Sequence, residues 1–81
     1  MISAPQSRAA RGLLNWSQRD LAQRANVAPR TLALFEQGKR FPYERTVDRI
    51  RAAFEEAGVS FLDDGKSTGV ILSETHSSSG S

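Results

Sequence analysis

The side chains of this chain that could bind a charged ligand are mostly arginines, and every arginine lies before residue 52. Residues 1–51 hold ten basic and four acidic side chains, a formal charge of +6, whereas residues 52–81 hold one lysine and five acidic side chains, a formal charge of −4. Guanidinium and ammonium groups concentrated in one half of a chain indicate a surface that binds a polyanion. The alternative is that the arginines only solvate helix faces, an interpretation we favour for Arg49 or Arg51 taken singly.

No set of residues typical of an enzyme can be found in the sequence. The single histidine, His76, lies in a polar segment near the end of the chain, and no nucleophile stands beside a base. The absence of cysteine excludes thiol chemistry and a cysteine-based zinc site. Asp63, Asp64 and Gly65 lack the twelve-residue calcium pattern, so a hairpin turn is the better interpretation. We therefore expect no enzymatic activity, no metal and no cofactor.

The basic half must be positioned by structural elements that the sequence also indicates. Between Ser17 and Gly38, Leu21 and Ala25 share one face of a first short helix, and Leu32 and Phe35 share one face of a second. Each helix thus offers an apolar stripe to the other. With 81 residues, the chain has room for one small domain a few helices thick.

The residues at the corner between these two helices are those that a tight turn needs. Ala22 lets the helices cross closely, and Asn26 tolerates a positive φ at the bend. Val27 supplies an apolar side chain beneath the corner, and Pro29 suits the first turn of the second helix, where its missing N–H would be unpaired anyway. This joint pattern predicts a helix-turn-helix, the motif that places a helix in DNA. An ordinary helical hairpin with no role in DNA binding is the alternative.

Periodicity predicts further helices over residues 5–14 and 44–57, the latter ending at Gly58. Ser17 and Asp20 form a capping-box pattern, and Trp16 before them is interpreted as a core or staple residue. The β-prone runs at residues 59–62 and 69–72 predict a hairpin. The expected organisation is a helix-turn-helix domain over residues 1–58, a hairpin over residues 59–73 that packs on it or serves dimerisation, and a disordered tail over residues 74–81.

The chain resembles the phage-repressor-like helix-turn-helix family, also called the Xre/Cro family. The resemblance rests on the segment RAARGLLNWSQ at residues 8–18, on Leu21 and Ala22, and on FEQG at residues 35–38, and it continues to Gly69 and Val70. It implies an all-α fold, a compact four-helix lambda-repressor-like domain with a short C-terminal β-hairpin or strand pair. Because there is no signal peptide or membrane-length apolar run, a soluble protein of the cytoplasm is expected. The resemblance implies that this cytoplasm is bacterial and that the protein is associated with the nucleoid.

The resemblance also implies which residues meet DNA. Gln18 matches a phosphate-contacting glutamine, and Arg30 matches a base-reading position, where its forked donors could take both acceptors of a guanine edge. The other positions that match DNA-facing ones are Ala28, Pro29, Thr31 and Leu34, followed by Lys39, Arg40 and Tyr43 against the DNA backbone. Many relatives carry hydrogen-bonding residues where Ala28 and Leu34 stand. We therefore expect modest base readout, with much of the affinity coming from phosphate contacts and DNA shape.

One further pair carries a structural role in the resemblance. Family members often pair an arginine of the first helix with the glutamate that ends the recognition helix, which is the second helix of the helix-turn-helix. Here those residues are Arg11 and Glu36. Such an ion pair would brace the recognition helix, whereas the alternative is that Arg11 faces solvent or a phosphate.

The function predicted from these observations is sequence-specific binding of double-stranded DNA by a transcriptional regulator that represses. Because one helix-turn-helix reads few base pairs, we expect a homodimer on an inverted repeat with half-sites about 34–36 Å apart or a multiple of that. The dimer surface would be the helix over residues 44–57 or the hairpin edge. The alternative function is a protein-interaction module, an antitoxin or an antagonist of another regulator with the same fold.

Overall fold

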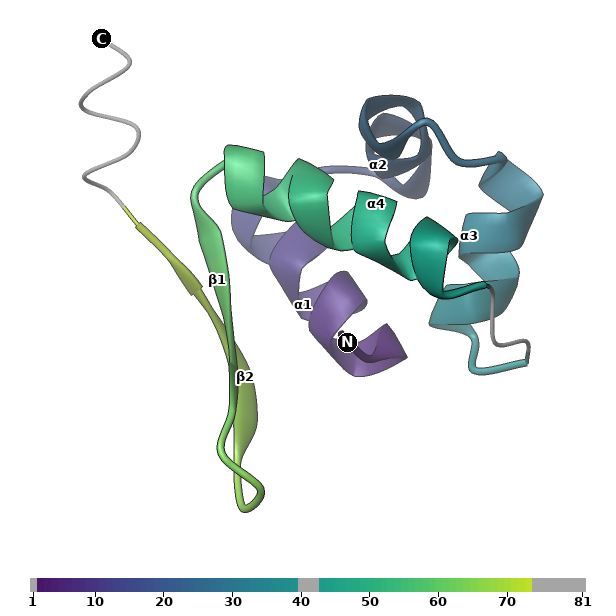
Figure 1. Cartoon of the computed structure of the whole chain (residues 1–81). Coiled ribbons are helices and arrows are strands. Elements are labelled where there is room, and N and C mark those ends of the chain that lie inside the picture. Colours follow the sequence, from purple (N-terminus) through teal and green to yellow (C-terminus); the bar gives the residue numbers. More distant parts are fainter. Residues whose placement is uncertain (1, 40–42, 74–81) are drawn as a thin grey trace, which may run out of the picture.

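The structure is a computed structural model that describes residues 2–39 and 43–73 (Figure 1). Four helices are followed by two antiparallel strands, which confirms the predicted fold class. The elements are α1 (Ala4–Leu14), α2 (Gln18–Ala25), α3 (Pro29–Glu36), α4 (Glu44–Glu56), β1 (Val59–Asp63) and β2 (Thr68–Leu72). The tail predicted over residues 74–81 lies outside the described residues. Within them, no helix is both long enough and apolar enough to cross a bilayer.

The limits of α2 are set by its own side chains. Ser17 and Asp20 form the predicted capping box, in which the hydroxyl accepts from the Asp20 N–H and the carboxylate accepts from the Ser17 N–H. The helix ends at Asn26, whose φ of 57° is the predicted left-handed conformation. Asn15 ends α1 in the same conformation, with a φ of 59°. The predicted capping box and the predicted left-handed residue at the corner are therefore both confirmed.

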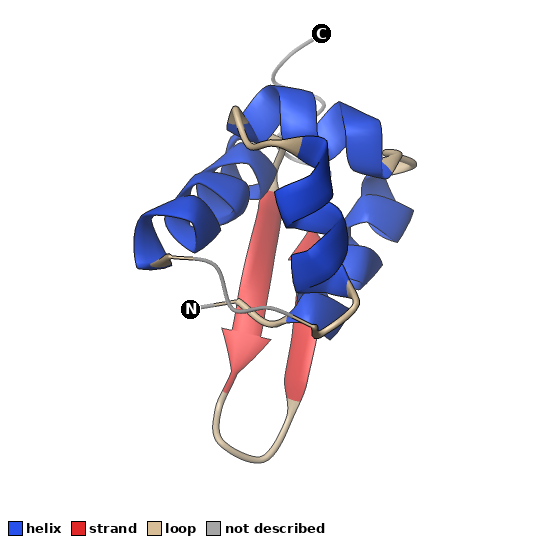
Figure 2. Cartoon of the chain, turned by 90° about the vertical axis from the view of Figure 1, so that its right-hand side faces the viewer, coloured by secondary structure: helices blue, strands red, loops and turns tan. Residues whose placement is uncertain are grey.

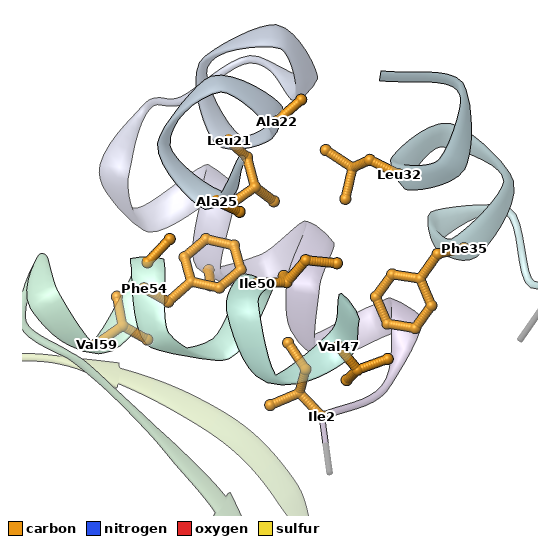
Figure 3. Packing of buried hydrophobic residues seen from close by; sticks show 12 residues of the cluster. Ile2, Leu21, Ala22, Ala25, Leu32, Phe35, Val47, Ile50, Phe54 and Val59 are labelled. Carbon is orange, nitrogen blue, oxygen red and sulfur yellow. The ribbon is translucent and has the colours of Figure 1, made fainter. Parts of the chain in front are cut away.

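The core forms where α2, α3 and α4 meet, as Figure 3 shows from close by. Leu21, Leu32, Ile50 and Phe54 are fully buried there, and burying each such side chain contributes about 1.5–3 kcal/mol. Trp16 stacks on Phe54 with ring centroids 5.7 Å apart, in agreement with its interpretation as a packing residue. The apolar stripes of α2 and α3 thus pack in the core and fix the angle between the two helices.

The two strands form the predicted hairpin, and each is one residue longer toward the turn than expected. Their register pairs Val59 with Leu72 and Phe61 with Val70, which places these four side chains on the same face of the hairpin. That face packs on the core, with α1 against β2 and α4 against β1. In Figure 2 the strands lie behind the helices. The hairpin therefore packs on the helices through this face.

Gln6 ties the hairpin to α1. Its side-chain Nε2 donates to the carbonyl oxygens of Leu62 and Gly69, at 3.2 and 3.3 Å, and these two residues are paired across the strands. The same side chain accepts from the Ser3 N–H in the capping box of α1. Because Gln6 is buried, these hydrogen bonds satisfy a polar group that would otherwise destabilise the packing.

Candidate nucleic-acid interface

Helix α3 has one buried face and one exposed face. Leu32, Phe35 and Glu36 are buried against the rest of the domain, whereas Pro29 and Arg30 are exposed at the start of the helix. Figure 1 shows α3 at the edge of the helical body, on the side away from the hairpin. A helix held this way by its inner face leaves its outer face available to the major groove of a duplex.

The first turn of α3 carries no side-chain cap. Its N-cap residue, Ala28, lacks a side-chain acceptor, and Pro29 at the first helical position lacks an N–H. The side chains of Thr31 and Leu34 are half-buried on the flanks of the helix. An uncapped first turn leaves backbone N–H donors that an acceptor on DNA can use.

The remaining residues implied to meet DNA follow α3 or precede it. Lys39 is exposed after the end of α3, and Tyr43, the N-cap residue of α4, is 86% exposed. Arg40 lies outside the described residues. Gln18 occupies the first position of α2 and is half-buried, because its side chain turns toward the end of α3. The structure thus places the Gln18 side chain against the end of α3. Lys39 and Tyr43 lie between α3 and α4.

A buried carboxylate links the end of α3 to α1 and α2. Glu36, which is 2% exposed, accepts from Arg11 Nη2 at 2.8 Å and from Arg11 Nε at 3.0 Å to both carboxylate oxygens. Its Oε2 also accepts from the Ser7 hydroxyl, and its Oε1 accepts from Gln18 Nε2 at 3.0 Å. Arg11 and Glu36, paired by the family resemblance, are therefore in direct contact in the structure.

Two members of this cluster were not anticipated from the sequence. Ser7 is fully buried and donates to the carboxylate, and Arg8 Nη1 donates to the backbone carbonyl oxygen of Glu36. The Arg8 contact satisfies a carbonyl at the end of α3 that the helix itself leaves unpaired. The available signal was spacing, since Ser7 and Arg11 stand four residues apart and so share one face of α1.

The ionised form of Glu36 is stabilised by its neighbours. Burial alone would raise the pKa of the carboxyl, but hydrogen bonds from Arg11, Ser7 and Gln18, together with the charge of Arg11, outweigh burial and hold the pKa below its ordinary value of 4.5. The folded protein therefore binds a proton at Glu36 less readily than the unfolded chain does. This contribution to stability is complete above the unfolded pKa and is lost as pH falls through the folded pKa.

This linkage predicts an acid-sensitive fold. We expect the free energy of unfolding to fall as the pH is lowered from about 5 to about 3, measured by urea denaturation at each pH. Asp20 contributes in the same direction, because hydrogen bonds from the backbone and then the hydroxyl of Ser17 lower the pKa of its carboxyl. The Glu36→Gln variant separates the two, since it should show a shallower pH dependence than the parent. An unchanged slope in that variant would contradict the assignment to Glu36.

The surroundings of the exposed arginines decide which of them are free to meet a ligand. Arg24 lies over the Trp16 ring, 4.5 Å from its centroid, and Arg51 is paired with Glu55 on α4 at 3.0 Å. Arg30 has no ion-pair partner among the described residues. No group of three or more His, Asp or Glu able to hold a metal occurs in the part of the chain that the structure describes. Hydrogen bonding and charge attraction toward an anionic partner are the chemistry that this face offers.

A comparison with known protein families matches the part of the chain that contains this site. The model of a helix-turn-helix family matches residues 8–56, a range that contains α2, α3 and α4 and most of α1. The matched range also contains every residue that the sequence implied to meet DNA, together with Arg11 and Glu36. A search of curated proteins gave no match.

Proposed function

Because this chain belongs to the phage-repressor-like helix-turn-helix family, a family of DNA-binding transcription regulators and not of enzymes, we propose that it represses transcription by occupying an inverted-repeat operator as a homodimer. It would act on the nucleoid in the bacterial cytoplasm. The observation that carries the proposal is the exposed outer face of α3. The opposite face of this helix is buried in the core and includes Glu36. The helix also belongs to residues 1–51, which have a formal charge of +6. This combination suits the major groove of a negatively charged duplex.

In this proposal the residues divide their work by position. Arg30 reads a guanine edge through two parallel hydrogen bonds, and Ala28 and Leu34 offer apolar contact to thymine methyl groups. Gln18 and Lys39 donate to phosphates. Tyr43 would join them on the DNA backbone, and so would Arg40, which lies outside the described residues. Pro29 and Thr31 complete the surface of α3 against the groove. Few of these side chains form hydrogen bonds with bases, so specificity rests partly on the shape of the duplex.

The salt dependence of duplex binding tests the proposal. We expect fluorescence anisotropy to show affinity that falls linearly with salt on a logarithmic plot, with a slope of about −0.9 for each phosphate neutralised. Lys39→Ala should reduce the magnitude of that slope by about 0.9, the value for one phosphate contact. Lys66→Ala, on the hairpin turn, should leave the slope unchanged. Failure of the protein to bind a duplex even at low salt would refute DNA binding and favour the alternative function.

That alternative is a protein-interaction module, an antitoxin or an antagonist of another regulator. The observation that favours it is the outer face of the hairpin, where Leu62 is 45% exposed and Ile71 is 57% exposed. The register places both side chains on the face opposite to the core, next to Ser60 and Gly69. Exposed apolar side chains that adjoin one another are typical of a surface covered by protein.

For the homodimer, we propose that a second copy covers this outer hairpin face, in place of the pairing along the hairpin edge that the sequence led us to expect. The other candidate surface, the exposed face of α4, consists mainly of charged residues around one alanine: Arg45, Asp48, Arg49, Ala52, Glu55 and Glu56. Charged residues are depleted from the centres of protein interfaces, whereas apolar ones are enriched. The hairpin spanning residues 59–73 would then both complete the core of the domain and join two copies.

Paired substitutions distinguish the two dimer surfaces. Leu62→Thr with Ile71→Thr keeps the preference for strand but removes apolar area, so we expect sedimentation equilibrium to show a shift from dimer toward monomer. Ala52→Glu is the matched change on α4, and it should leave the dimer intact. Dissociation by Ala52→Glu with no effect of the hairpin variant would assign the dimer surface to α4 instead.

A further inference from the structure

The Gln18 side chain is hydrogen-bonded to the buried carboxylate of Glu36. Its side-chain Nε2 donates to Glu36 Oε1 at 3.0 Å, although Gln18 opens α2 and Glu36 closes α3. We propose that Glu36 is a positioning residue for DNA binding, which holds the Gln18 amide so that its second N–H meets a phosphate at the start of α2. The inference rests on the proposed function, because it assumes that Gln18 contacts DNA.

The chemistry of the amide sets the direction in which Gln18 presents its donors. A glutamine amide has two N–H donors on its nitrogen and one acceptor oxygen. A carboxylate accepts only, so the nitrogen and not the oxygen must face Glu36. One N–H is used in that hydrogen bond and the other remains. Gln18 is the first residue of α2, where the backbone N–H groups also lack partners within the helix.

The carboxylate is itself fixed, which makes it a firm support. Ser7 donates to one of its oxygens and Arg11 donates to both, so two residues of α1 hold Glu36 in addition to Gln18. The side chain of Glu36 is 1% exposed and that of Arg11 is 20% exposed. Water therefore competes little for the carboxylate.

The same cluster removes two obstacles to phosphate binding. Arg11 balances the charge of Glu36 at 2.8 Å, so the carboxylate does not repel an approaching phosphate as an unpaired anion would. A free glutamine side chain must be ordered when DNA binds, whereas Gln18 is already ordered by Glu36 in the free protein. The end of the recognition helix and the phosphate contact of α2 are thereby coupled through a single side chain.

A double-mutant cycle measured on duplex binding tests this coupling. Gln18→Met keeps the length of the side chain and removes its hydrogen bonds, and Glu36→Asp keeps the charge but withdraws the carboxylate by one methylene. We expect Gln18→Met to weaken binding of a short mixed-sequence DNA duplex roughly tenfold, the value for a hydrogen bond to a charged group. In the Glu36→Asp background, the same change should cost much less, because the amide is no longer held. Affinities are compared only at a temperature where denaturation curves show every variant to be folded.

A second measurement uses the free protein and does not depend on DNA. The side-chain amide resonances of Gln18 should be well dispersed in the parent protein and should move toward those of a solvated amide in Glu36→Asp. If Glu36→Asp does not fold, the parent protein alone decides, because Gln18 Nε2 bound to Glu36 Oε1 should give amide resonances that differ from those of a solvated amide. Gln18 resonances that are already those of a solvated amide in the parent would overturn the positioning role.

The outcomes separate this inference from the proposed function. Equal losses from Gln18→Met in both backgrounds would overturn positioning by Glu36 and leave DNA binding in place. No loss from Gln18→Met in the parent would show that Gln18 does not contact a phosphate, which also overturns the inference. Absence of duplex binding by the parent protein would refute the proposed function itself.

Discussion

Replacing Arg11 with methionine should lower the free energy of unfolding by about 3–5 kcal/mol, the usual cost of removing one partner from a buried ion pair. Methionine keeps the apolar stem of the side chain but leaves Glu36, which is buried, without its cation. Ser7 and Gln18 can still donate to the carboxylate, but neither carries a charge. Urea denaturation at neutral pH measures the loss directly.

The chain contains a matched control for this substitution. Arg51 pairs with Glu55 at 3.0 Å on α4, where the two side chains are 41% and 50% exposed and Arg51 also lies 5.8 Å from the centroid of the Phe61 ring. Arg51→Met should therefore cost at most about 1 kcal/mol, the upper range for exposed ion pairs. Similar small losses in both variants would mean that the Arg11 pair does not stabilise the fold more than a surface pair does.

The second large effect is expected at Arg30. On the preferred operator, Arg30→Ala should weaken binding by about 1–3 kcal/mol, because a guanine edge would lose two hydrogen bonds. The variant should also lose its preference at one base position of each half-site. Binding measured against a set of single-base operator variants, in parallel for the parent and Arg30→Ala, gives both quantities.

Arg49→Ala provides the comparison, since Arg49 is also exposed but belongs to α4 and not to α3. We expect it to leave the order of preference among the operator variants unchanged. If Arg30→Ala weakened every sequence equally, Arg30 would be a phosphate contact and the reading role would pass to other residues of α3.

Local patterns were sufficient to predict most of the fold. The capping box at Ser17 and Asp20 and the left-handed Asn26 depend on residues only a few positions apart. The same reasoning would have predicted the left-handed Asn15, since asparagine again follows the last turn of a helix. Periodicity located α1 and α4 to within one residue at their ends, because apolar spacing reflects which face of a helix is buried, and the β-prone runs located the two strands equally closely.

The contacts at the candidate site were harder to predict, because they join three helices that are distant in sequence. Arg11 and Glu36 were paired through a family resemblance, whereas the spacing of Ser7 and Arg11 indicates a shared helix face but not that Ser7 is buried beside Glu36. The contact of Gln18 with Glu36 depends on how α2 and α3 cross, which spacing alone does not define. Hydrogen bonds of this kind follow from packing, and packing is known only once the helices are assembled.

Mapping the duplex contact on the protein shows whether the outer face of α3 enters DNA. The measurement is a titration of the isotope-labelled protein with a DNA duplex, followed through its backbone amide resonances. We predict that the largest shifts occur at the start of α2 around Gln18 and along residues 28–34, with small shifts on the hairpin. Shifts confined to the outer hairpin face around Leu62 and Ile71, with α3 unchanged, would contradict the account.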